Sequence, residues 1–145
     1  MIKETILGKI FDVILGQILK LLKKSIYLSL NIEYFRTYFI IKNTSMSPII
    51  ISEIGFLEDK RMFNLKAKCL YSIKVRKKVA SNDFASIGVN SYLIKNALLS
   101  SENTSNIFVI PYVKDHQGKL YKMKKIYMDL NKLSDRSLCK SDLGL

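Results

Sequence analysis

The sequence has little of the chemistry from which most active sites and metal centres are built. It contains one histidine, His116, and two cysteines, Cys69 and Cys139, so the usual four-ligand zinc set needs carboxylates as well. It has no CxxC, HExxH, GxSxG or EF-hand motif, and its six glycines are scattered and form no phosphate-binding loop. We therefore expect a protein that is not an enzyme, with no catalytic residue, no metal and no cofactor.

Two cysteines are also too few for a disulfide framework. Reduced thiols fit a cytoplasmic protein, and we expect this location, with the membrane periphery as the alternative. Cys69 falls among apolar positions and is expected to be a small core residue, whereas Cys139 lies in a polar tail.

Acidic residues are scarce relative to basic ones, at 12 against 24, so the 145-residue chain carries a formal charge of +12. Its apolar content of 48% and charged content of 25% are typical of a globular protein, and its length is typical of a single domain. A surplus this large favours an anionic partner, which could be nucleic acid, anionic lipid or an acidic protein, although it also simply promotes solubility.

Residues 1–25 predict an amphipathic helix with an unusually wide apolar face. Polar or small residues recur three or four apart and form one narrow stripe: Thr5, Lys9, Asp12, Gly16, Lys20 and Lys23. The apolar run is broken by Asp12 and Gln17, so it is too short to span a membrane and does not read as a secretory signal.

Three interpretations of this helix stay open. It could pack on its own domain, lie in a membrane interface, or associate with another copy or a partner. The apolar residues expected to make the contact are Ile10, Phe11, Ile14, Ile18 and Leu21.

From residue 26 the hydrophobic period changes to two, which predicts strands in a domain spanning 26–130. Turn residues in "NTSMSP" separate two strands, and "NIFVIPYVK", "DHQG" and "KLYKMKKIYMDL" predict a hairpin with a positive φ at Gly118. Pro111 predicts that its strand is at an edge or bulged. "SYLIKNALLS" could be a short helix or an irregular strand, and 131–145 is expected to be a polar tail. The pattern favours an antiparallel β-sandwich behind the helix.

The stretches "FIIKNTSMSPIIISEIGF" and "VKDHQGKLYK" resemble small uncharacterised proteins of Gram-positive phages and mobile elements. The likeness covers residues 35–57 and 107–123. It implies an immunoglobulin-like sandwich behind an amphipathic N-terminal helix and a phage or mobile-element setting, and it brings no functional residues.

The stretch "NLKAKCLYSIKVRKK", residues 64–78, has many cations and no acid. Apolar and basic residues alternate, with Leu70 as the exception, which predicts one half-buried strand, or two joined near residue 70. The outward cations would form a basic face, or would only be solvated. The candidate binding residues are Lys66, Lys68, Lys74, Arg76, Lys77 and Lys78.

These features predict a non-enzymatic protein that binds a macromolecule through its basic sheet face and its apolar helix. The partner would be a host protein or protein–nucleic-acid complex, or nucleic acid directly, and inhibition of a host defence complex is one such role. The alternatives are a peripheral protein that binds anionic lipid and an oligomeric virion or assembly component that self-associates through the helix.

Overall fold

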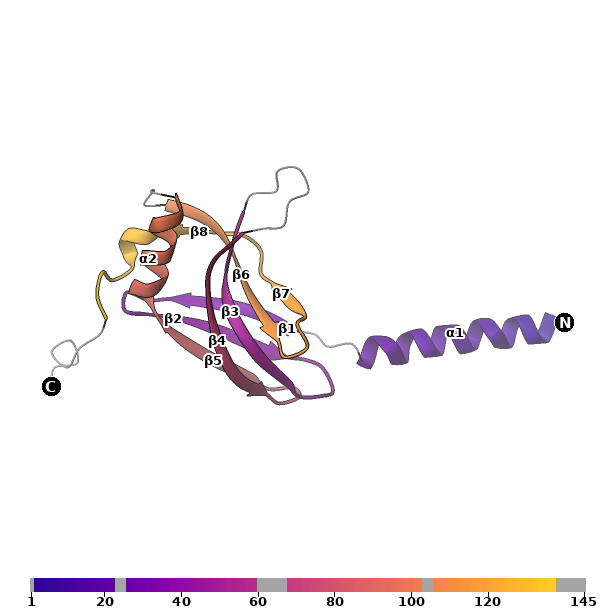
Figure 1. Ribbon diagram of the computed structural model, residues 1–145. Helices are drawn as coiled ribbons and strands as arrows, with labels where there is room; N and C mark the ends of the chain where they lie inside the picture. Colours follow the sequence, from indigo (N-terminus) through magenta and orange to yellow (C-terminus); the bar gives the residue numbers. More distant parts are fainter. Residues whose placement is uncertain (1, 23–25, 60–67, 103–105, 138–145) are drawn as a thin grey trace.

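The computed structural model describes residues 2–22, 26–59, 68–102 and 106–137, with side-chain surroundings within the first helix for residues 7–17. It shows two antiparallel β-sheets and a helix, α1 (Ile2–Leu22), which extends away from them (Figure 1). The expected mainly-β antiparallel architecture behind an N-terminal helix is therefore confirmed.

The smaller sheet has three strands in the order β1 (Ile26–Ile32), β2 (Arg36–Asn43) and β5 (Phe84–Asn90). The larger sheet has the order β4 (Cys69–Val79), β3 (Ile49–Glu58), β6 (Asn106–Asp115) and β7 (Leu120–Lys122), and β8 (Ile126–Asp129) also pairs with β6. All pairings are antiparallel.

The hydrophobic core lies between the two sheets. The rings of Phe39 on β2 and Phe56 on β3 have centroids 5.4 Å apart, and both side chains are fully buried. The period-two alternation explains this, because it sends every second side chain of each strand to the same face. β1 follows the same rule, with Ile26, Leu28 and Leu30 half-buried towards the core.

The undecided stretch after β5 forms a helix, α2 (Ser91–Glu102). Ile94 and Leu98 are four residues apart and both are fully buried in the core. The buried Ser91 hydroxyl at the start of α2 donates to the backbone oxygen of Glu33 at 2.8 Å and lies 3.0 Å from the Thr37 hydroxyl. Packing on the core and this polar anchor make the segment a helix.

β4 is one strand with an irregularity at Leu70, the residue that breaks the alternation in its sequence. Phe56 pairs with Tyr71, but Leu57 pairs with Cys69, so β4 has one extra residue at Leu70. The bulge turns Leu70 into the core and leaves Cys69 exposed. The prediction that Cys69 is a core residue is therefore wrong, because the bulge reverses the parity at this end of the strand.

The strand that contains Pro111 is not an edge strand. β6 lies between β3 on one side and β7 and β8 on the other. The backbone oxygen of Pro111 accepts from the Met123 N–H, so its missing donor faces the gap between β7 and β8. The proline is tolerated inside the sheet because no strand residue pairs with it on that side.

The hairpin turn and the C-terminal segment complete the domain. Gly118 has a φ of +87°, which confirms the expected positive value. After the 3-10 turn η1 (Leu130–Lys132), Leu133 and Ser134 are buried, so the packed domain continues beyond the boundary expected at residue 130. Cys139 and the rest of the expected tail from residue 138 lie outside the described residues.

Candidate functional site

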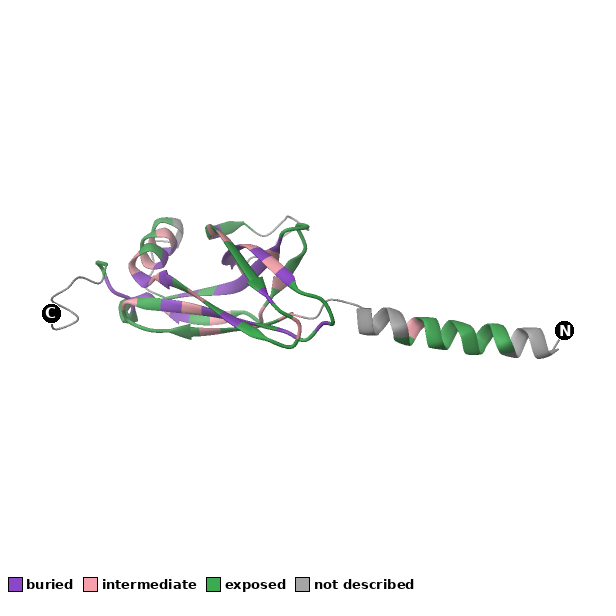
Figure 2. Ribbon diagram, turned by 90° about the horizontal axis from the view of Figure 1, so that it is seen from below, coloured by how far each residue is buried: buried purple, intermediate pink, exposed green. Residues whose placement is uncertain are grey.

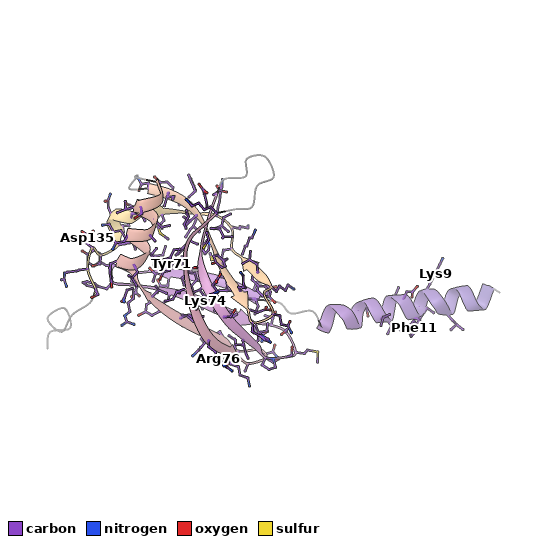
Figure 3. All side chains as sticks on the ribbon, viewed as in Figure 1. Lys9, Phe11, Tyr71, Lys74, Arg76 and Asp135 are labelled. Atoms are coloured by element: carbon purple, nitrogen blue, oxygen red, sulfur yellow. The ribbon has the colours of Figure 1, made fainter. Side chains whose placement is uncertain are left out.

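The predicted basic residues lie on β4, which is an edge strand of the larger sheet. Lys74, Arg76, Lys77 and Lys78 are exposed, and so is Lys68, which directly precedes the strand. Figure 3 labels Lys74 and Arg76, both of which belong to β4. Lys66 lies outside the described residues, so the structure does not place the first member of the predicted row.

One acidic residue on the neighbouring strand forms an ion pair with a single member of this row of cations. Glu53 of β3 pairs with Lys74 across the sheet, and the Lys74 Nζ donates to its Oε1 at 2.5 Å. The Tyr112 hydroxyl donates to the Glu53 Oε2 at 2.7 Å, and the Lys114 Nζ lies 3.7 Å from the same oxygen. The charge on Lys74 is therefore balanced by a nearly buried carboxylate that is distant in sequence.

The same contacts set the acidity of this cluster. The hydrogen bond from Lys74 lowers the pKa of Glu53 below its usual value, against the opposing effect of burial. Burial, with the neighbouring Cys69 and Glu53 side chains, raises the pKa of the Tyr112 hydroxyl. Glu53 is thus ionised and Tyr112 neutral around pH 7, as a structural ion pair requires.

An edge strand gives the remaining cations a structural role as well. Unpaired edge strands are prone to join another sheet, and lysine side chains on them hinder such pairing. Among the described residues, Lys68, Arg76, Lys77 and Lys78 form no salt bridge, in contrast to Lys74, Lys95, Lys114 and Lys125. These four are therefore the described cations of the predicted basic face whose charge no salt bridge balances.

The predicted helix face is exposed to solvent. On α1, Ile10 and Ile14 are each 50% exposed and Phe11 is 64% exposed, and the whole described middle of the helix is drawn as exposed or intermediate (Figure 2). Lys9 and Phe11 project to opposite sides of α1, as the narrow polar stripe predicts (Figure 3). Ile18 and Leu21 also belong to α1, but their surroundings lie outside the described residues. The described face does not pack on its own domain.

The structure also reveals a group of exposed apolar residues at one end of the sandwich, which the sequence did not indicate. We call this end the proximal end, because the chain enters it from α1. It comprises the start of β1, the turns 44–48, 80–83 and 116–119, and the strand ends that these turns join. Met46, Phe84 and Tyr27 project from it with exposures of 69%, 68% and 65%.

A signal for these residues was present but weak. Tyr27 occupies an outward position of β1 and Phe84 an outward position at the start of β5, where polar residues are the norm. Isolated exposed apolar residues are common, so only the three-dimensional grouping makes them notable.

Other chemistry is sparse in the described part of the chain. Those residues contain no group of three or more His, Cys, Asp or Glu side chains that could hold a metal ion. Their helices include none that is long and apolar enough to cross a membrane. His116 is exposed in the β6–β7 turn, where its backbone N–H donates to the backbone oxygen of Ile50.

Comparisons with known proteins add little to this description. No family model and no curated protein matches the chain. Among solved structures, it is similar to the putative ApaA protein from Bordetella pertussis, with 10% identity and a TM-score of 0.35. That match covers 72% of this chain and 93% of the other. A likeness at this level carries no argument about function.

Proposed function

We propose that this protein is a non-enzymatic binding protein that α1 attaches to the surface of an anionic membrane. The observation that supports the proposal is the exposed apolar face of α1, on which Leu7, Phe11 and Val13 are each more than 60% exposed. A helix with such a face and a lysine-containing polar stripe lies in the interface between headgroups and acyl chains.

The balance of forces favours this arrangement. Burying one large apolar side chain contributes about 1.5–3 kcal/mol, so a few inserted residues outweigh the cost of bringing the protein to the surface. Lys9 on the polar stripe would meet anionic headgroups, and the sequence adds the cations Lys20, Lys23 and Lys24 further along the chain. Each of these cations adds about 1 kcal/mol near such a surface.

The test is flotation of the full-length chain with vesicles of phosphatidylcholine alone or mixed with phosphatidylserine. Wild type should float with the anionic vesicles, less so as salt rises. Ile14→Asp places a charge on the apolar face and should abolish flotation. Gly16→Asp is the matched control, because it adds the same charge to the polar stripe, where an added Cβ meets nothing within 4 Å.

Self-association through α1 is the second candidate, because its apolar face is wider than an interfacial helix needs. Sizing of the lipid-free protein distinguishes the two. An oligomer that Ile14→Asp converts to a monomer, with no flotation by wild type, would contradict the membrane proposal and favour the assembly role.

The remaining parts of the proposal rest on the sequence. The cations Lys68, Arg76, Lys77 and Lys78 support an anionic partner for the domain, which could be a host protein, a protein–nucleic-acid complex or nucleic acid. An immunoglobulin-like topology and a phage or mobile-element setting, with inhibition of a host defence complex, follow from the resemblance alone.

A further inference from the structure

The short connection between α1 and the sandwich limits where the proximal end can lie. α1 ends at Leu22 and β1 begins at Ile26, so four residue steps join them. A fully extended chain spans at most about 3.6 Å per residue, which gives about 14 Å here. When α1 lies in a membrane interface, Ile26 at the proximal end is therefore held within about 14 Å of the end of the helix.

The proximal end carries the right side chains for that surface. Among the described residues of the sheets and their turns, the most exposed large apolar side chains are Met46, Phe84 and Tyr27. Tyr27, Lys42 and Phe84 form one cross-strand row on the outer face of the smaller sheet, because Lys42 pairs with both neighbours. Aromatic rings beside a cation suit the boundary between acyl chains and headgroups.

This surface is held rigidly by a buried asparagine. The Asn43 Nδ2 donates to the backbone oxygens of Ser47 at 2.9 Å and Val79 at 3.1 Å, and the Ser45 N–H donates to the Asn43 Oδ1. The Ser81 hydroxyl donates to the backbone oxygen of Ser45, so the turn that holds Met46 is bonded to the turn that precedes Phe84. The backbone that carries these exposed side chains is thus ordered before any contact with a membrane, which lowers the cost of binding.

The charge of the proximal end complements an anionic surface. The exposed cations Lys42, Lys77, Lys78 and Lys119 lie at this end, since Lys77 pairs with Ile51, which pairs with Asp115 beside the β6–β7 turn. Of the nearby acids, Asp115 is buried and accepts hydrogen bonds from the Gln117 and Lys119 N–H groups. The exposed Asp83 accepts from the Phe84 N–H. Cations therefore outnumber the single exposed acid.

From these observations we infer that the proximal end is a second lipid-binding site, which inserts Met46, Phe84 and Tyr27 into an anionic bilayer beside α1. The inference rests on the membrane function proposed above. The lysines of the proximal end contact the headgroups, and the opposite end of the sandwich faces the solvent.

The absence of tryptophan from the chain makes a clean test possible. Phe84→Trp in the full-length protein places one reporter at the proximal end, and Phe108→Trp places one on β6, about 23 Å from Asp115 at that strand's proximal end. Phosphatidylserine-containing vesicles should shift the indole emission of the Phe84→Trp variant to the blue, and brominated lipid should quench it. The emission of the Phe108→Trp variant should not change.

A second pair of variants measures the contribution to binding. Met46→Ser combined with Phe84→Ser should weaken partition into these vesicles by about a hundredfold, because two exposed apolar side chains no longer insert. Phe108→Ser combined with Tyr127→Ser, which removes two exposed aromatic residues remote from α1, should leave partition unchanged. Circular dichroism checks that both variants are folded.

The outcomes separate this site from the function of α1. If wild type floats but the emission of the Phe84→Trp variant is unshifted, or both tryptophan variants shift equally, the second site is wrong and the membrane proposal stands. If the proximal double variant partitions like wild type, the second site is also overturned. If wild type does not float at all, both proposals fail.

Discussion

Among the described residues, the α-helices α1 and α2 are both rich in apolar residues but have opposite relations to solvent. On α2, Ile94 and Leu98 are fully buried in the core. On α1, the large apolar residues from Leu7 to Leu15 are 42% to 64% exposed. An apolar face therefore does not by itself identify a core element, and the uncovered one is the better candidate for function.

The polar contacts of α2 show how it is held. Ser91 bonds to the β1–β2 turn at the start of the helix, and Lys95 reaches Asp135 at 2.6 Å and the backbone oxygen of Leu133 at 3.3 Å. Figure 3 shows Asp135 beside this helix. α2 is thus joined to two other parts of the chain, and its apolar side chains stabilise the fold instead of a complex.

The same substitution in each helix tests this difference most strongly. Ile94→Asp buries an unpaired charge and should cost more than about 4 kcal/mol, which would unfold a domain of ordinary stability. Ile14→Asp should change the free energy of unfolding by less than about 0.5 kcal/mol. Urea denaturation followed by circular dichroism measures both. A large loss of stability in Ile14→Asp would show that α1 packs on the domain.

Glycine substitutions give a second, smaller contrast. A Cβ at Gly55 on β3 would overlap the backbone oxygen of Tyr71 and come within 2.9 Å of the Tyr112 ring. Gly55→Ala should therefore destabilise the sandwich by about 2–3 kcal/mol. A Cβ at Gly16 meets nothing within 4 Å. Gly16→Ala should therefore stabilise α1 by about 1 kcal/mol of helix propensity and increase the helical signal in circular dichroism. Equal effects at both sites would contradict the packing described for β3.

A third contrast is between Glu53, whose carboxylate is nearly buried, and an exposed glutamate. Glu53→Gln removes two charge-assisted hydrogen bonds and should destabilise the protein by about 1–2 kcal/mol at pH 7. Because folding lowers the pKa of Glu53 from 4.5, its contribution is fully present above that value and is lost as the pH falls through the folded pKa. The stability difference between wild type and Glu53→Gln should thus shrink below about pH 4.5.

The control for this measurement is Glu33→Gln, at an exposed position in the β1–β2 turn, which should change stability little. A gap between wild type and Glu53→Gln that grew on acidification would mean that the carboxylate is not held by Lys74.

The smallest effect on stability is expected for the uncovered cations. Changing Arg76, Lys77 and Lys78 together to Glu should alter the melting temperature by only a few degrees, because exposed charges contribute little to folding. The triple variant should nevertheless bind anionic vesicles more weakly, as flotation would show. Unchanged binding would indicate that these residues serve only to protect the β4 edge.

Local patterns in the sequence predicted most of the secondary structure. The period of two marked β1, and the spacing of polar residues marked α1. Gly118 predicted a turn with a positive φ, which the structure has. Such signals depend on neighbours within a few residues, which is why a single sequence reveals them. The spacing around Leu70 even indicated the irregularity in β4, though not its effect on Cys69.

Contacts between distant residues could not be predicted in the same way. Lys74 meets Glu53 only because of the register between β3 and β4. The turn that holds Met46 lies beside the turn that precedes Phe84 only because Asn43 and Ser81 join them. α2 is a helix in which Ile94 and Leu98 face the core, although its sequence alone left a strand open. Strand register and the closure of the core set which side chains become neighbours, and these arise from packing across the whole chain.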